Sequence, residues 1–416
     1  MAATATKLSG AVAFRYPDFV NFQVARWFVV CATEMQSVAI GWQIFAITGR
    51  PLDLGLVGLF QFAPVLLLFL IAGHAADRFD RRKLLILCYI GLATCSALLL
   101  TESLRGVHTV APIYAVTGLI GLVRAFYGPA GRSVLPQLVP EEHFPNAVAW
   151  AGMVFQSATI LGPSAGGLIY AAARGPSAVY AAAMISALFA TGSMWFVKAP
   201  TKIRSAEEIS LARIFAGLHY IWREKLILGS ISLDLFAVLL GGATALLPAY
   251  AVLLRTGPWG LGLLRSAPGV GAVAMAIFVA YRPIERRAGL TMLWCVGAFG
   301  LFTILFGLSR SLPLSLIALF FVGASDMVSV IVRGTLVQLA TPDQMRGRVN
   351  AVDMIFVGAS NELGGFESGA TAQLFGTVPA VVLGGIGTLV VASLWAWIFP
   401  QIRETDQLAT ASENVA

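Results

Sequence analysis

Acidic residues lie inside long apolar stretches of this sequence, where a charge is costly. Glu34 falls within residues 20–46 and Asp234 within residues 227–253, at an offset of 200 residues. A charged side chain at the centre of a membrane costs roughly 2.5–3.5 kcal/mol on insertion scales. Because a buried carboxyl group binds a proton more tightly than one in water, such acids can take up and release protons. We expect Glu34 and Asp234 to face each other across a central cavity and to bind protons or substrate.

Asp326 and Glu362 are further candidates for proton coupling or substrate binding. Asp326 and Arg333 are seven residues apart and share one face of a helix. Glu362 and Glu367 are five residues apart, about 140° around a helix, so only one of them can face a given partner well. The alternative for each of these acids is a permanent, structural pair with an arginine. The arginines inside the apolar stretches are Arg26, Arg124, Arg265 and Arg333.

The composition explains why apolar residues surround these charges. Of the 416 residues, 58% are hydrophobic and only 12% are charged, whereas soluble domains contain roughly 25% charged residues. A helix of about 20 apolar residues crosses a bilayer. The sequence therefore predicts an all-α membrane protein of twelve transmembrane helices, at residues 20–46, 52–73, 84–104, 110–131, 145–171, 177–197, 227–253, 260–281, 289–309, 312–335, 350–375 and 378–400.

Lys and Arg residues outside the helices predict the orientation of the chain. With both termini on one side of the membrane, 19 of these residues fall on that side and 5 on the other. Positive charge accumulates on the cytoplasmic side, so we expect both termini to be cytoplasmic in a multi-pass protein of the inner (plasma) membrane. The expected parts are a cytoplasmic N-terminus (1–19), an N-terminal six-helix half (20–197), a cytoplasmic central loop (198–226), a C-terminal six-helix half (227–400) and a cytoplasmic tail (401–416).

The two halves contain matching polar segments. Residues 132–138 (RSVLPQL) resemble residues 333–339 (RGTLVQL) at an offset of 201, and residues 146–148 match residues 350–352 at an offset of 204. Both segments lie between the fourth and fifth expected helices of their half. The pattern predicts two pseudo-symmetric six-helix halves, which is the architecture of major facilitator transporters. In the central loop, apolar residues between Ile209 and Ile221 predict an amphipathic helix on the membrane surface.

The segment after the second expected helix carries a known motif. It reads Gly73-His-Ala-Ala-Asp77-Arg78-Phe-Asp80-Arg81-Arg82-Lys83. It resembles the major facilitator signature Gly-x-x-x-Asp-Arg-x-Gly-x-Arg-Lys. The resemblance implies a major facilitator fold, with a conformational motif at Gly73, Asp77, Arg78, Arg81 and Arg82. In that motif Asp77 pairs with a facing arginine or helix N-terminus and latches one conformation. The alternative is that the basic residues only mark the cytoplasmic side.

One position departs from this signature, because Asp80 replaces the second glycine. Taken with residues 129–136 (PAGRSVLP) and residues 247–250 (LPAY), the departure resembles one bacterial exporter branch. That branch includes enterobactin (siderophore) exporters and macrolide-efflux-like proteins. The resemblance implies export of a small molecule.

The fifth expected helix contains Gly162-Pro163-Ser-Ala-Gly166-Gly167, which resembles the Gly-Pro-x-x-Gly-Gly motif of proton-coupled antiporters. Pro163 removes a backbone donor and bends the helix, and the glycines permit close contact with other helices. We expect a pliable seam between the halves; ordinary Gly and Pro enrichment is the alternative. Arg124 resembles the arginine of the antiporters' fourth helix, which implies a role in proton transfer. A buried structural ion pair is the alternative for Arg124.

These features predict a secondary active transporter that exports a siderophore or drug-like compound by proton antiport with alternating access. The alternative is a solute importer of the same fold, such as a sugar or metabolite symporter. The expected partners are a small-molecule substrate, protons and the lipid bilayer, and we expect a functional monomer.

Other classes of function lack support in the sequence. The chain contains no Gly-x-x-x-x-Gly-Lys-Ser/Thr phosphate-binding loop. Its four Cys and four His residues show no metal-ligand spacing, so we expect neither a metal nor a cofactor. Basic residues fall between apolar blocks and form no nucleic-acid-binding patch. We do not expect an enzyme, because catalytic side chains are not clustered.

Overall fold

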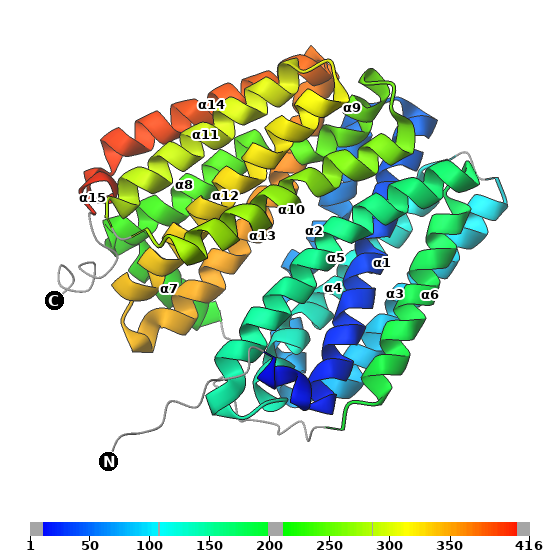
Figure 1. The fold of residues 1–416 in the computed structure, drawn as a ribbon, viewed down its shortest axis with the longest axis horizontal. Coiled ribbons are helices and arrows are strands. Elements are labelled where there is room, and N and C mark those ends of the chain that lie inside the picture. Colours follow the sequence, from blue (N-terminus) through cyan, green and yellow to red (C-terminus); the bar gives the residue numbers. More distant parts are fainter. Residues whose placement is uncertain (1–10, 107–108, 199–210, 285, 406–416) are drawn as a thin grey trace.

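The computed structural model describes residues 11–106, 109–198, 211–284 and 286–405 (Figure 1), and every regular element in these ranges is a helix. The short 3-10 helices η1 (Val12–Arg15), η2 (Leu135–Gln137) and η3 (Glu141–His143) join longer elements. The first half of the chain forms six long helices: α1 (Pro17–Thr48), α2 (Pro51–Arg78), α3 (Arg81–Leu104), α4 (Ala111–Val134), α5 (Phe144–Ala173) and α6 (Ser177–Trp195).

Local sequence explains where these helices begin and end. Proline occupies the first turn of α1, α2, α4 and α5, where its missing N–H costs nothing. Gly49 ends α1 in the left-handed conformation, with φ 63°, and its N–H donates to the Phe45 carbonyl. The Asp80 carboxylate caps α3 by accepting from the N–H groups of Arg82 and Lys83.

The second half of the chain begins with α7 (Leu211–Arg223), which lies within the expected central loop. Residues 199–210 of that loop lie outside the described residues. The expected helix 227–253 is divided into α8 (Lys225–Gly241), η4 (Ala243–Leu246) and α9 (Leu247–Leu253). The remaining helices are α10 (Gly257–Tyr281), α11 (Ala288–Leu308), α12 (Leu312–Ala340), α13 (Asp343–Phe375), α14 (Thr377–Ile398) and the short α15 (Pro400–Glu404).

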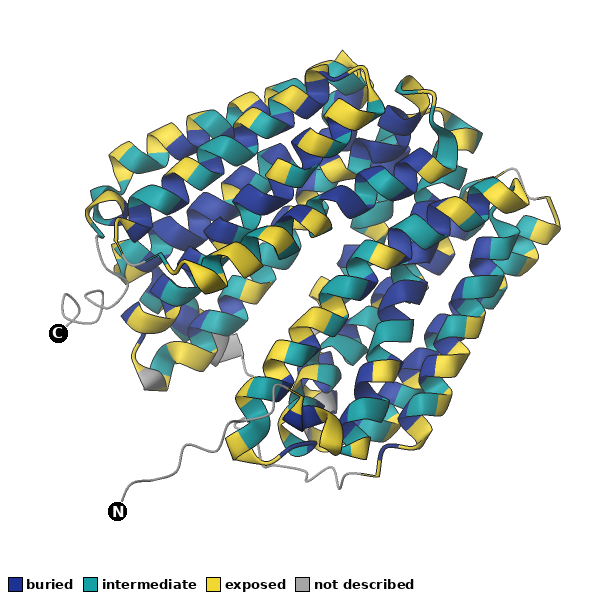
Figure 2. Ribbon diagram, viewed as in Figure 1, coloured by how far each residue is buried: buried dark blue, intermediate teal, exposed yellow. Residues whose placement is uncertain are grey.

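Ten helical segments of the described residues are long and apolar enough to cross a membrane, with α8 to α9 counted as one. The two other long helices, α5 and α13, complete the twelve. α13 is more polar because it carries Asp353, Glu362 and Glu367. Figure 2 shows exposed residues along the outward faces of the helices. Many are large and apolar, such as Leu67, Trp294 and Trp397, as expected for a surface that faces lipid.

The two halves repeat one packing pattern. In the first half α1 packs on α5, α2 on α4, and α3 on α6. In the second half α8 packs on α13, α10 on α12, and α11 on α14. These pairs correspond helix by helix when α8 with α9 is equated with α1. The structure therefore has two pseudo-symmetric six-helix halves, the N-half (α1–α6) and the C-half (α8–α14).

The most extensive contacts between the halves are symmetry-related and join α2 with α13 and α5 with α10. We call the end of the bundle at which α1 begins the terminal end, and the opposite end the distal end. Near the distal end the backbones meet closely. A Cβ on Gly55 would lie 2.9 Å from the Gly365 carbonyl oxygen, and one on Gly167 would lie 2.5 Å from the Pro258 carbonyl oxygen. In Figure 1 the halves diverge from these contacts towards the terminal end.

Candidate substrate cavity and buried charges

A cavity of about 810 Å³ lies between the halves on the terminal side of these contacts. Its walls come from α1 to α5 and from α13, so the N-half supplies most of the lining. The N-half lining near the terminal end is open to solvent, because Val148 and Phe155 are 45% and 41% exposed. This volume lies within the 300–1,000 Å³ typical of small-molecule sites. We call it the outer compartment.

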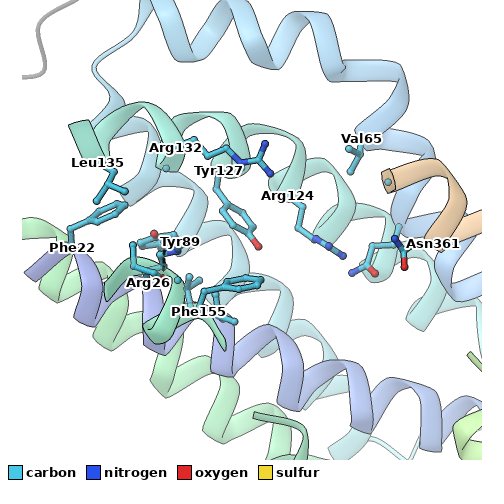
Figure 3. A pocket seen from close by; sticks show the side chains of 18 of the residues that line it. Phe22, Arg26, Val65, Tyr89, Arg124, Tyr127, Arg132, Leu135, Phe155 and Asn361 are labelled. Atoms are coloured by element: carbon cyan, nitrogen blue, oxygen red, sulfur yellow. Dashed lines mark hydrogen bonds between the residues drawn. The ribbon is translucent and has the colours of Figure 1, made fainter. Parts of the chain in front are cut away.

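Three arginines of the N-half line the outer compartment (Figure 3). Arg26 of α1 donates to the Ala151 carbonyl at 3.3 Å, and its guanidinium lies 5.3 Å from the centroid of the Phe155 ring. Arg132 at the end of α4 contacts the sulfur of Met354 on α13. Arg124 lies two turns earlier on α4, and Figure 3 shows its side chain pointing towards Asn361. Within the outer compartment the only described acidic residue is Glu362.

Aromatic rings separate these positive charges. Phe22, Phe62, Tyr89, Tyr127 and Phe155 contribute to the lining. Tyr127 interacts with the Arg124 guanidinium one helical turn away, and Figure 3 shows its hydroxyl end directed towards Phe155. Such rings offer flat apolar faces and, in tyrosine, a polar edge. The outer compartment therefore suits a ligand that is both aromatic and negatively charged.

A second compartment of about 320 Å³ continues the cavity towards the distal end. We call it the inner compartment, and it shares Arg124, Tyr127, Asn361 and Glu362 with the outer one. Its other charged residues are Glu34 of α1 and Arg265 of α10, whose Oε2 and Nε atoms are 3.9 Å apart. Both side chains are partly open, at 28% and 32% exposure. This pair links the N-half to the C-half.

A second charge interaction joins the halves, this time with the base in the N-half and the acid in the C-half. Arg124 of the N-half interacts electrostatically with Glu362 of the C-half, and more weakly with Glu34. The Glu362 carboxylate lies against the backbone of α2, where a Cβ on Gly58 would be 2.8 Å from Oε2. Each half thus places one acid and one base in the inner compartment. Protonation of either acid would weaken its interaction with the arginine across the interface.

The structure brings three of the five candidate coupling residues together, because Glu34, Arg124 and Glu362 all line the inner compartment. The expectation that Glu34 and Asp234 face each other across a cavity is wrong. Asp234 is directed into the C-half, where its Oδ2 lies 3.4 Å from Nη2 of Arg333. The offset between repeats gives the position of a residue along its helix but does not show which residue its side chain faces. Asp234 faces a buried arginine of its own half.

Asp326 also lies inside the C-half rather than in either compartment. It interacts electrostatically with Asp234 and Arg333, as its shared helix face with Arg333 suggests. Arg333 additionally forms an ion pair with Asp353 of α13. We call Arg333, Asp234, Asp353 and Asp326 the C-half cluster.

The fifth-helix motif lies where α5 contacts both α1 and α10. A Cβ on Gly162 would lie 2.7 Å from Cβ of Glu34, and one on Gly166 would lie 2.8 Å from Cα of Met35. On the adjoining face Gly167 meets the backbone of α10 at Pro258 and Gly262, and a Cβ on Gly262 would lie 2.6 Å from the Pro163 carbonyl oxygen. The motif therefore positions the helix that carries Glu34 and forms part of the contact between the halves.

The helix 2–3 motif lies at the terminal end of the N-half. Gly73 is buried in α2, and Arg78 is exposed at its last residue. Arg81 is buried and donates to the Ser133 carbonyl at 3.3 Å, and Arg82 donates to the Trp195 carbonyl at 2.5 Å. The Asp77 side chain lies outside the described residues, so its expected latch contact stays a prediction.

Sequence reasoning did not select Arg26, Arg132 and Arg265 as site residues. Arg26 and Arg265 already stood out as arginines inside apolar stretches. Arg132 belongs to the repeated segment whose counterpart contains Arg333. The cost of an intramembrane charge was enough to mark Arg26 and Arg265 as unusual. It could not show which half or compartment their side chains would face.

Comparison with known proteins agrees with this architecture. Residues 9–415 match the family model of the transmembrane secretion effectors, MFS_3. The chain belongs to this family. It is 25% identical over 413 residues to the enterobactin exporter EntS of Escherichia coli O1:K1 / APEC, with 96% of each protein covered. The EntS of Shigella boydii serotype 18 (strain CDC 3083-94 / BS512) is 24% identical over 412 residues, again with 96% of each covered. The resemblance to a major facilitator exporter branch is confirmed.

Solved structures share the fold. The nucleoside transporter NupG superposes with a TM-score of 0.74 at 11% identity, covering 92% of this chain and 100% of that one. A bacterial homolog of the human lysosomal transporter Spinster, inward-facing and occupied, gives 0.71 at 13% identity, covering 94% and 99%. The D-xylose-proton symporter gives 0.67 at 15% identity, covering 92% and 98%. The protein is thus a membrane transporter with the major facilitator fold, and its substrate is a small molecule.

Proposed function

We propose that this transporter exports a small aromatic anion across the inner membrane in exchange for protons. The observation that carries the proposal is the charge of the cavity. Its two compartments together contain Arg26, Arg124, Arg132 and Arg265 against only Glu34 and Glu362 among the described residues. The positive excess and the aromatic walls favour a ligand such as a catecholate, which has the chemistry expected of a siderophore. The names of the relatives, as enterobactin exporters, support the same class.

The expected orientation of the chain gives the cavity access to the cytoplasm, as loading of an exported substrate requires. The unequal distribution of Lys and Arg residues predicts that both termini, and with them the terminal end of the bundle, face the cytoplasm. The outer compartment lies towards this end, and the contacts between the halves lie towards the other. The structure then corresponds to an inward-facing state that accepts substrate from the cytoplasm. Alternating access moves the two halves about the cavity, as in other transporters built from two repeats.

Proton antiport requires that substrate and protons occupy the inner compartment in turn, and its two acids can enforce this alternation. Glu34 and Glu362 lie beside Arg265 and Arg124, so an anion held by the arginines can donate hydrogen bonds from its ring hydroxyls to the two carboxylates. When the acids bind protons, these charge-assisted bonds are lost and the substrate is released. Substrate and protons therefore exclude each other, which couples export of the one to entry of the other. One chain contains both halves and both compartments, so we propose that a monomer suffices.

Transport into inverted membrane vesicles tests this function. Vesicles acidified inside by respiration should accumulate a labelled aromatic anion such as 2,3-dihydroxybenzoate, or its larger conjugates, and should not accumulate the neutral amide of the same ring. A protonophore should abolish accumulation, and Glu34→Gln should uncouple it from the pH gradient. Accumulation in intact cells with none in inverted vesicles would support the importer alternative. Accumulation that is insensitive to the protonophore would contradict antiport.

A further inference from the structure

The C-half cluster is not part of the substrate cavity, yet two of its charged side chains, Arg333 and Asp234, are among the most deeply buried of the described residues, and Asp326 and Asp353 are partly buried beside them. The side chains of Arg333 and Asp234 are only 6% and 8% exposed, and that of Asp353 is 22% exposed. The cluster joins three helices, because Asp234 belongs to α8, Arg333 to α12 and Asp353 to α13. Apolar residues of the same helices surround it, including Leu233, Val328, Val332 and Leu336.

The charges of this cluster do not balance. Three carboxyl groups, on Asp234, Asp326 and Asp353, share the single guanidinium of Arg333. The other titratable side chain lining the void between Asp234 and Asp326 is Cys295 of α11, which supplies no positive charge. With every acid ionised the cluster would carry two uncompensated negative charges in an apolar core. Such charge is strongly disfavoured, so a positive counter-charge is required. One added positive charge halves the excess, and the remaining negative charge is shared by Asp234 and Asp353 around Arg333, with Asp353 partly exposed to solvent.

The space available favours a proton as this counter-charge. Asp234 and Asp326 line a void of about 10 Å³, together with Ser325 and Ser329. A void must reach about 10–15 Å³ to hold even one water molecule, so a hydrated metal ion does not fit. In the described part of the chain no group of three or more His, Cys, Asp or Glu side chains is arranged to hold a metal ion. A proton needs no such volume.

We propose that the C-half cluster is a second proton-binding site, separate from the cavity, and that Asp326 carries its proton. Asp234 and Asp353 are both engaged by Arg333. By contrast, neither a hydrogen bond nor an ion pair within 4 Å joins the Asp326 side chain to another described residue. The carboxyl group that lacks a cationic partner is the one that keeps its proton. This inference rests on the proposed proton antiport and adds a site to it.

The site has a direct mechanical connection to the cavity. Asp353 and Glu362 lie on the same helix, α13, nine residues apart, which is about 13.5 Å along the axis. Loss of the Asp326 proton adds a negative charge that competes with Asp353 for Arg333. Competition weakens the hold of α12 on α13, the helix that lines both compartments and contacts α2 of the N-half. Proton exchange in the C-half can thereby bias the movement of the halves.

Infrared difference spectroscopy of the full transporter in lipid nanodiscs tests the site. Spectra taken at neutral and alkaline pH report protonated carboxyl groups directly, with no substrate present. We expect Asp326→Asn to remove one protonated-carboxyl band that Glu362→Gln, in the cavity, leaves in place. We also expect Asp326→Asn to keep the thermal stability of the wild type at neutral pH, because a neutral amide replaces a neutral acid. Asp353→Asn should lower that stability, since it breaks a buried ion pair.

Two outcomes overturn the proposal. One is an unchanged set of carboxyl bands in Asp326→Asn. The other is a loss of stability in Asp326→Asn equal to that in Asp353→Asn, which would mean that Asp326 is ionised and paired with Arg333. The function itself is tested separately by vesicle transport. If the band disappears as expected while wild-type export ignores the protonophore, the proton site stands and antiport fails.

Discussion

Glu362 of α13 lies against α2 and interacts with Arg124 of α4. The importance of its position can be tested by adding one methyl group to α2. A Cβ on Gly58 would lie 2.8 Å from the Glu362 Oε2 atom. Because this atom ends a flexible side chain, we expect Gly58→Ala to displace the carboxylate from Arg124 without preventing folding. Loss of one charge-assisted interaction, about 1.5–3 kcal/mol, corresponds to a roughly 10- to 150-fold lower export efficiency in vesicles.

The matched control for this change is Gly297→Ala on α11, where an added Cβ meets nothing within 4 Å. It should keep wild-type export and thermal stability. Full export in Gly58→Ala would show that the position of the Glu362 carboxylate does not matter for transport.

Arg26 provides a second test at the residue scale. Its guanidinium lies over Phe155 in the outer compartment and is held by the Ala151 carbonyl. We expect Arg26→Gln to raise the KM for an aromatic anion by roughly 10-fold or more, since a charged contact is worth about 1.5–3 kcal/mol. Transport of the same anion at several concentrations measures this effect, and Arg174→Gln outside the cavity is the control. An unchanged KM would mean that the substrate does not reach Arg26.

Spacing along the sequence predicted part of this site and mispredicted the rest for a physical reason. Glu34 and Glu362 became candidates because a charge inside a membrane needs a partner or a function, and Arg124 because it resembles the arginine of the antiporters' fourth helix. The same argument found Asp234, but the repeat offset could not show that Asp234 faces Arg333 within the C-half. Rotation about the helix axis depends on side chains from distant helices, which the spacing of one helix does not contain.

The elements were predicted more completely than the contacts between them. Each of the twelve expected helices corresponds to a helix or helix pair in the structure, because long apolar stretches can cross a membrane in few other ways. The break between α8 and α9 was not expected. It occurs at Gly242, where an added Cβ would lie 3.0 Å from the carbonyl carbon of Gly364 on α13. Only the tertiary contact reveals that this glycine marks an interruption.

Helix α5 supports a prediction at this scale. Gly167 packs backbone to backbone against α10, so the methyl group of Gly167→Ala would clash with the Pro258 carbonyl at 2.5 Å. Neither backbone can move aside alone. We expect a loss of about 1–3 kcal/mol in stability, the usual cost of overpacking, together with separation of the halves near the distal end. Thermal unfolding in detergent measures the first effect, and spin-label distances across α5 and α10 measure the second.

Gly192→Ala on α6 is the comparison for this change, because an added Cβ there meets nothing within 4 Å. If Gly167→Ala behaved like Gly192→Ala in both measurements, the contact between α5 and α10 would not hold the halves together.

For the whole molecule, the proposed alternating-access cycle requires the contact between α5 and α10 to open in each turn. Ser164 of α5 and Ser266 of α10 have hydroxyl oxygens 2.8 Å apart across this contact. Side chains this close suit a disulfide, whose Cβ atoms are about 3.5–4.5 Å apart. In a background lacking the four native cysteines, Cys31, Cys88, Cys95 and Cys295, we expect Ser164→Cys with Ser266→Cys to cross-link on oxidation and to stop export.

The reductant provides the decisive comparison for this cross-link. Reducing the disulfide should restore export, because the halves regain the freedom to separate at the distal end. Each single cysteine variant should transport equally in oxidising and reducing conditions, since it cannot join the halves. A cross-linked transporter that still exported at the wild-type rate would mean that α5 and α10 stay in contact throughout the cycle. Substrate would then have to leave by a route other than between these two helices.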